Sequence, residues 1–140
     1  MCYAIYLSTD LEDDLSKYNT ALVQFERVDV GNPIISSLEY IHKWYVASKS
    51  GCSCTFRHLT SVELGFGAPV DWYKEGENEI AATLTFIKVI RKLIDRGAKV
   101  DCIDTWFGTE PSDIQQMSVD LSVIEDDQFR FFENYHFLFL

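Results

Sequence analysis

Residues 75–97 restrict the fold of this chain more than any other stretch, because they form one amphipathic helical pattern that ends at a glycine. At about 100° per residue, charged side chains fall on one side of this helix and apolar side chains cover a broad arc opposite. The apolar arc consists of Ile80, Phe86, Ile87, Val89, Ile90, Leu93 and Ile94. Gly97 can adopt the left-handed backbone that commonly ends a helix. The pattern predicts a main helix over about residues 77–96.

Seven other segments are rich in β-branched and aromatic residues or alternate between apolar and polar side chains, the pattern of strands. They are residues 2–8, 20–28, 43–48, 52–58, 98–106, 117–124 and 129–140. Many strands with a single long helix indicate the α+β class. We therefore predict a mostly antiparallel sheet of about five to seven strands, with the main amphipathic helix packed on one face, in a single globular domain spanning residues 1–140.

Three details of the sheet follow from the spacing of these segments. Residues 43–48 and 52–58 are separated by a Lys-Ser-Gly loop, which predicts an antiparallel hairpin. Residues 98–106 and 117–124 are expected to pair in the antiparallel sense across a ten-residue connection. Residues 129–140 are apolar on both pleated faces, which favours a strand covered on both sides. A C-terminal helix is the alternative for that last segment.

The charge of the chain limits its partners. It has 22 acidic and 12 basic residues and a formal net charge of -10. That field repels polyanions, so nucleic acid and anionic membranes are excluded as expected partners. No apolar run approaches the roughly 20 residues of a membrane helix, and the N-terminal residues lack the basic region of a secretory signal. We expect a cytoplasmic protein with its cysteines reduced, and nothing in the sequence indicates a cofactor.

The segment Gly51–His58 places Cys52, Cys54 and His58 on one face if it forms a strand, because alternate residues point the same way. Free cysteine packs as a small apolar side chain, so we interpret this face as core and expect both thiols to be buried, without a metal. The alternative is a thiol or metal site built on Cys52, Cys54 and His58, with Cys2 and Cys102 as further ligands.

Two regions supply candidates for a ligand pocket. The loop of residues 64–76 carries Phe66, Asp71 and Trp72, and could form one wall of a pocket. Asp104 and Trp106 share a face of the predicted strand over residues 98–106. Because Asp104 lies two residues from the end of that strand, a solvated position at the rim is favoured. A buried Asp104 with a raised pKa, close to the loop, is the alternative.

These features do not identify a reaction, and the sequence contains none of the common catalytic signatures. We therefore expect a binding or interaction domain whose protein or small-molecule ligand is unspecified, and whether the chain is an enzyme stays open. The alternative is a thiol- or metal-dependent protein that uses the Cys52, Cys54 and His58 strand. The apolar side chains of residues 129–140 need burial on two faces, which favours a homodimer over a monomer.

Overall fold

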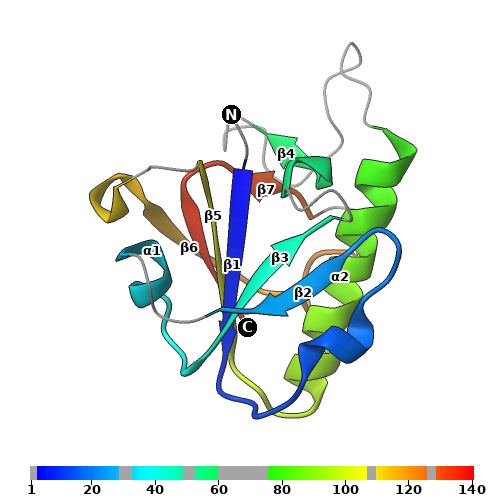
Figure 1. Cartoon of the computed structure of the whole chain (residues 1–140), viewed down its shortest axis with the longest axis horizontal. Coiled ribbons are helices and arrows are strands. Elements are labelled where there is room, and N and C mark those ends of the chain that lie inside the picture. The colour runs from blue at the N-terminus through cyan, green and yellow to red at the C-terminus, as the bar shows by residue number, and fades with distance from the viewer. Residues whose placement is uncertain (1–2, 29–32, 49–52, 60–75, 107–109, 126–128) are drawn as a thin grey trace.

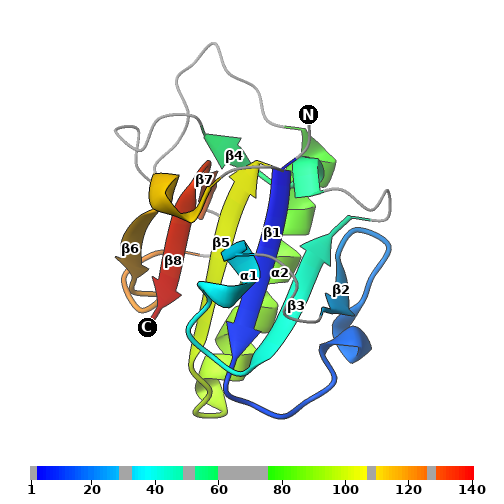
Figure 2. The same ribbon diagram turned by 60° about the vertical axis from the view of Figure 1, so that its left-hand side comes forward.

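A six-stranded sheet with one long helix on one face forms the body of the protein (Figures 1 and 2). The computed structural model describes residues 3–28, 33–48, 53–59, 76–106, 110–125 and 129–140. Its strands are β1 (Tyr3–Thr9), β2 (Gln24–Arg27), β3 (His42–Ala47), β4 (His58–Leu59), β5 (Val100–Trp106), β6 (Gln115–Val119), β7 (Phe131–Phe132) and β8 (Tyr135–Phe139). Its helices are α1 (Pro33–Ser36) and α2 (Glu77–Asp95), with 3-10 turns η1 (Leu15–Tyr18), η2 (Ser53–Thr55) and η4 (Pro111–Asp113).

The strands of the large sheet follow the order β2-β3-β1-β5-β8-β6. Every neighbouring pair in it is antiparallel except β8 and β6, which run parallel. The short strands β4 and β7 pair in parallel beside this sheet. The predicted α+β class, the mostly antiparallel sheet and the main helix packed against it are all confirmed. The single domain over residues 1–140 stays a prediction.

Helix α2 covers one face of the sheet, as Figure 2 shows with α2 behind the strands and α1 in front of them. Its buried stripe includes Phe86, Ile87, Ile90 and Leu93, the apolar arc predicted from the sequence. They pack with apolar side chains of the sheet and with a group of phenylalanines on β7, β8 and the residues around them. Each fully buried side chain of this size stabilises the fold by about 2 kcal/mol. The main core therefore lies between α2 and the sheet.

The opposite face of the sheet has a smaller core. Ile34, Ile35 and Leu38, in and just after α1, cover Tyr6 and Ile103 near the middle of the sheet. Because α1 is only four residues long, its cover extends over β1 and β5 and does not reach β8 and β6 in Figure 2.

The predicted hairpin between residues 43–48 and 52–58 is wrong. β3 already pairs with β1 along one edge and with β2 along the other, so it has no edge left for a third strand. The chain instead turns at η2, where the buried Ser53 hydroxyl donates to the Val46 carbonyl at 2.6 Å and accepts from the Ile5 amide at 3.1 Å. Ser53 therefore occupies the inward position, and the next residue, Cys54, is exposed.

Replacing Ser53 by alanine should lower the free energy of unfolding by about 2 kcal/mol, because a buried amide and a buried carbonyl would each lose a hydrogen bond. Urea denaturation monitored by circular dichroism measures this loss. Ser16→Ala is the control, since the Ser16 hydroxyl bonds Asp14 at an exposed position and its loss should change stability by less than about 0.5 kcal/mol. Equal losses in both variants would contradict the role given to Ser53.

The predicted antiparallel pairing of residues 98–106 with residues 117–124 is also wrong. β8 lies between β5 and β6, so β6 pairs with β8 and is the outer strand. β8 suits an inner position because Phe137 and Phe139 on one face pack into the main core and His136 on the other face is buried. β6 is mostly exposed, which suits an edge. The strand predicted over residues 129–140 is confirmed in β7 and β8, and the helical alternative is wrong.

Two turns shorten the predicted strands. β6 ends at Val119 because the Asp120 carboxylate accepts hydrogen bonds from the Ser122 amide and hydroxyl and closes a turn. Val123, expected on the same face as Val119, is consequently 75% exposed. Between β7 and β8 the chain reverses at Asn134, whose φ of 60° lies in the left-handed region that asparagine tolerates.

Among the described helices, none is both long and apolar enough to cross a membrane.

Candidate functional site

The candidate site lies at the end of the sheet where β1 begins and β5 ends, close to β4 and β7 (Figures 1 and 2). Tyr3 of β1 is paired with Trp106 of β5 in the antiparallel ladder. His58 of β4 reaches Asp104 of β5, and Glu133 approaches from the turn between β7 and β8. We call Tyr3, His58, Asp104, Trp106 and Glu133 the sheet-end site. It brings together Asp104, Trp106 and His58, which the sequence had singled out separately.

Asp104 is fully buried, with 0% exposure. Its two carboxylate oxygens each lie 3.0 Å from His58 Nε2. Among the described residues, only Oδ1 has a hydrogen-bond partner, and Oδ2 has none. Burial raises the pKa of Asp104 to about 6, although nearby His58 acts in the opposite direction, and Glu133 raises it a little further.

The predicted solvated position of Asp104 is therefore wrong. The distance of a residue from its strand end does not reveal what covers it, and here β4 brings His58 over the end of β5. The alternative stated from the sequence, a buried carboxyl with a raised pKa, is confirmed in that respect. Its expected contact with the loop carrying Phe66, Asp71 and Trp72 cannot be followed, because those three residues lie outside the described ranges.

His58 has hydrogen-bond partners at both ring nitrogens. Nδ1 lies 3.0 Å from the Phe56 carbonyl oxygen, which can only accept, so Nδ1 carries a proton. Nε2 lies 3.0 Å from Asp104 Oδ1, which is its hydrogen-bond partner. Neither nitrogen is free to accept a proton from a substrate or to bind a metal in this arrangement.

The His58, Tyr3 and Trp106 rings form one stack at this site. The Tyr3 ring lies 3.8 Å from the His58 ring at an interplanar angle of 10°. Its other neighbour is Trp106, at 4.1 Å and 28°. The Tyr3 hydroxyl donates to Glu133 Oε2 at 3.1 Å. Burial, and then the charge of Glu133, raise the pKa of Tyr3 well above its ordinary range. The Tyr3 ring is therefore fixed by its two ring neighbours and by the hydrogen bond of its hydroxyl. The stack ends at Trp106, which is partly exposed.

Cys54 does not occupy the buried position that the sequence predicted. Cys54 is exposed, and its sulfur accepts a hydrogen bond from the Tyr3 amide at 3.2 Å. Cys102 is buried, and its pKa is raised well above the ordinary value by burial and by two neighbouring aspartates. Cys2 and Cys52 lie outside the described ranges. Within those ranges, no group of three or more His, Cys, Asp or Glu side chains is placed to hold a metal ion.

A second buried aspartate–histidine pair lies on the other face of the sheet. Asp101 Oδ2 is 2.6 Å from His136 Nε2 and accepts from the Glu39 amide at 2.9 Å. Asp101 Oδ1 accepts from the Ser8 hydroxyl, which in turn accepts from the Tyr40 amide at 3.0 Å. We call these groups the Asp101 latch. Because Ser8 bonds the aspartate rather than the histidine, the order needed to activate a serine nucleophile is absent.

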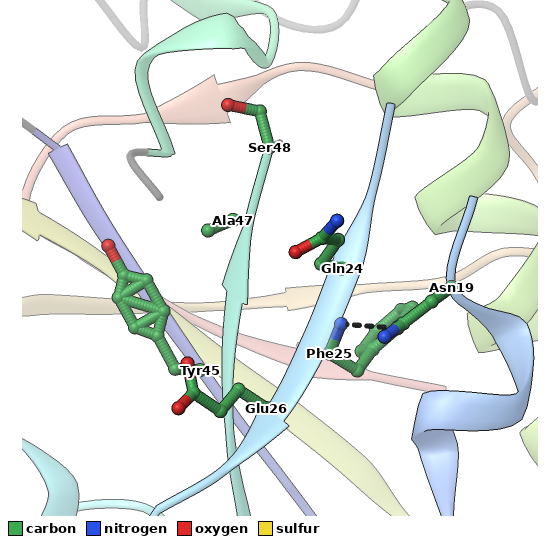
Figure 3. Close-up of a pocket in the computed structure, with 7 residues that line it drawn as sticks. All are labelled: Asn19, Gln24, Phe25, Glu26, Tyr45, Ala47 and Ser48. Atoms are coloured by element: carbon green, nitrogen blue, oxygen red, sulfur yellow. Dashed lines mark hydrogen bonds between the residues drawn. The ribbon is translucent and has the colours of Figure 1, made fainter. Parts of the chain in front are cut away.

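A small open pocket lies away from both pairs, beside β2 and β3 (Figure 3). Its volume is about 270 Å³, slightly below the usual range for drug-sized ligands. Its walls are Asn19, Gln24, Phe25, Glu26, Tyr45, Ala47 and Ser48. The Asn19 side chain is held in place by accepting from the Phe25 amide at 2.6 Å. The pocket contains none of the residues that the sequence singled out.

Tyr3 and Glu133 are the members of the sheet-end site that the sequence analysis missed. Tyr3 belongs to a predicted strand, but its place opposite Trp106 depends on the pairing of β1 with β5. Glu133 is one acidic residue in an aromatic segment, and only the turn before β8 brings it to the Tyr3 hydroxyl.

Comparison of the chain with family models, with curated proteins and with solved structures finds no match.

Proposed function

We propose that the protein is a binding domain that takes a cationic group of its partner, a lysine or arginine side chain or an organic amine, at the sheet-end site. The stack of His58, Tyr3 and Trp106, which ends in a partly exposed indole and whose tyrosine hydroxyl bonds Glu133, carries this proposal. An aromatic face attracts cations through its quadrupole, and indole is the best of these faces. A carboxylate at the edge of the stack adds a direct charge partner.

The electrostatics of the site support the same class of ligand. After burial, the negative charges of Glu133 and Asp104 raise the pKa of Tyr3, so two acidic groups lie close to the stack. The chain as a whole has a net charge of -10, which speeds the approach of cationic partners and repels anionic ones. A basic peptide segment or a small amine therefore fits the site better than a phosphate or a carboxylate.

Binding is favoured over catalysis because the His58 and Ser8 side chains are engaged within the protein. Both nitrogens of His58 have hydrogen-bond partners within the protein. The Ser8 hydroxyl bonds a carboxylate and not a histidine. A general base or a nucleophile needs a free lone pair within reach of the substrate. These side chains instead hold the sheet and the aromatic stack in fixed positions.

An NMR titration with butylammonium and with guanidinium tests the proposal. Saturable shifts of the Trp106 indole N–H and of the Glu133 amide are expected, with no matching response to butyrate. Glu133→Gln should weaken the apparent dissociation constant about fivefold and Trp106→Ala about tenfold, since cation–π attraction at such sites is worth about 1 kcal/mol. Glu12→Gln, which removes an exposed acid beyond the far end of β1, should leave it unchanged. Equal responses to butyrate and butylammonium would overturn the proposal.

A thiol-dependent function is the second candidate, and the exposed Cys54 supports it. Its sulfur already accepts the Tyr3 amide hydrogen at the base of the aromatic stack. Alkylation with iodoacetamide, followed by mass spectrometry and elemental analysis of the native protein, separates the two functions. Cation binding that survives alkylation supports the binding domain, whereas stoichiometric zinc, or a redox or acyl-transfer activity lost on alkylation, supports the thiol function.

We also place the protein in the cytoplasm, where its cysteines stay reduced. The homodimer favoured by the sequence agrees with the proposed function, because two copies would present two cation sites to one basic partner and bind it with higher avidity.

A further inference from the structure

The two outer strands of the large sheet, β2 and β6, differ in how their free edges are protected. On β2, the Asn19 side chain takes the outward amide of Phe25 at 2.6 Å. β2 also carries Glu26 and Arg27, and the Arg27 guanidinium lies over the Trp44 ring at 4.6 Å. Charges and side-chain caps of this kind are how proteins stop an edge strand from pairing with another chain.

On β6 the described residues provide none of these devices. Its sequence, Gln115 to Val119, contains no charged residue, proline or glycine. The ladder with β8 begins where the Gln115 amide donates to Asn134 at 3.0 Å and ends where the Leu140 amide donates to Val119 at 2.9 Å. In a parallel ladder alternate residues bond the neighbour, so the N–H and C=O groups of Gln116 and Ser118 point outward. Within the described ranges, no backbone hydrogen bond from another segment reaches them.

We propose that β6 pairs with β6 of a second copy of this chain, antiparallel about a two-fold axis at Met117. In this register Gln116 lies opposite Ser118 of the partner subunit. The two N–H and two C=O groups that each copy presents are then matched in four hydrogen bonds across the axis. Met117 faces its own counterpart, and Gln115 faces Val119 of the partner subunit, so no like charges meet in the ladder. The result is a continuous sheet through both subunits.

Exposed apolar side chains next to this edge support a second copy as the occupant. Within the described ranges the large apolar side chains that stay exposed are Ile41, Val123 and Leu140. Val123 lies in the turn that follows β6. The Leu140 amide donates a hydrogen bond to Val119, the last residue of β6. The exposures of Val123 and Leu140 are 75% and 63%. Both side chains therefore lie at the end of the sheet where β6 ends, the edge along which a second copy would pair.

The acidic charge of the chain sets the strength of this pairing. Asp113 and Asp120 flank β6, so two copies bring four carboxylates near the ends of the ladder. Each copy also has a net charge of -10. Repulsion between such charges is screened by salt. The interface of two short strands is small, so we expect a weak dimer, with a dissociation constant on the order of 0.1 mM at low salt, that tightens severalfold in high salt.

Analytical ultracentrifugation of the full chain over a range of concentrations tests the proposal, with Gln116→Pro as the decisive variant. Proline removes the outward N–H of residue 116, which the single subunit does not use, and proline is tolerated on edge strands. The variant should weaken dimerisation at least tenfold. Gln116→Ala is the matched control, because it removes the side chain but keeps the N–H, and it should dimerise like the natural chain.

Hydrogen exchange on the natural chain gives a second measurement that does not depend on a variant folding. The Gln116 and Ser118 amides should become protected as concentration rises, while the Gln24 and Glu26 amides on β2 should not respond. A natural chain that stays monomeric at millimolar concentration would overturn the proposal. So would a dimer that survives Gln116→Pro, or one in which the Gln116 and Ser118 amides exchange equally fast at all concentrations.

Discussion

Asp101→Ala is expected to lower the free energy of unfolding by about 4 kcal/mol, the largest loss we anticipate from a single substitution outside the apolar core. The Asp101 carboxylate is fully buried and accepts from the Ser8 hydroxyl, the Glu39 amide and His136 Nε2. Alanine would leave these buried donors without an acceptor, and each costs about 1 to 3 kcal/mol. Urea denaturation at neutral pH measures the loss.

The position of the amides that lose protection in Asp101→Ala is a second test of the Asp101 latch. Hydrogen exchange at the Glu39 and Tyr40 amides should speed up in Asp101→Ala well before global unfolding, because these two amides bond the latch directly. Asp101→Asn keeps one acceptor oxygen and the shape of the side chain, so its loss should be about half as large. A loss below about 1 kcal/mol in Asp101→Ala, or unchanged exchange at these amides, would show that water replaces the carboxylate without cost.

Asp104→Asn has the opposite expected sign, although Asp104 is equally buried. Its folded-state pKa is about 6, above the ordinary value of 3.8. Between those values the folded chain binds more protons than the unfolded chain, so the contribution of Asp104 to stability is lost as the pH rises from about 4 to about 6. That loss is on the order of 3 kcal/mol and persists at higher pH. Asparagine does not ionise and can donate to His58 Nε2.

The measurement is the free energy of unfolding of both proteins between pH 4 and pH 8. At pH 8 the asparagine variant should be more stable by on the order of 2 kcal/mol, and the difference should shrink as the pH falls below the pKa of Asp104. Asp120→Asn is the control, because hydrogen bonds from Ser122 lower the pKa of Asp120 and its removal should not stabilise the protein. A variant that is less stable than the natural chain at pH 8 would mean that the His58–Asp104 pair is net stabilising.

Asp101 and Asp104 lie on the same strand, β5, but their carboxyl groups have different surroundings. Asp101 has a hydrogen-bond partner at each oxygen. Asp104 has a hydrogen bond to one oxygen only. A protein that retains a buried carboxyl at a cost in stability commonly does so at a functional site, which is consistent with the sheet-end site as the place where a ligand binds.

Periodic features of the sequence predicted the elements that depend on local pattern. The apolar arc containing Phe86 and Ile90 predicted α2 to within a residue, because a helix that long must bury one stripe. Alternation along residues 98–106 placed Asp104 and Trp106 on one face, and both belong to the sheet-end site. These predictions required no knowledge of distant partners.

The strand order could not be predicted, because it depends on contacts between distant segments. Nothing local indicates that β8 separates β5 from β6, or that β1 and β2 take both edges of β3. The same limit explains the sheet-end site, since the burial of Asp104 depends on β4, a strand of two residues. The alternation rule failed at Cys54 because η2 is a 3-10 turn, in which a period of two residues does not apply.

The position of β8 also has a consequence for biosynthesis. β8 follows all other strands along the chain, yet it lies between β5 and β6. A chain released before residue 135 can pair β2, β3, β1 and β5, but its β6 has no neighbour in the sheet. The free side of β5, with Cys102 and Asp104, then stays open to other chains, and unpaired strand edges aggregate readily. Early termination before residue 135 should therefore increase the engagement of chaperones with this chain.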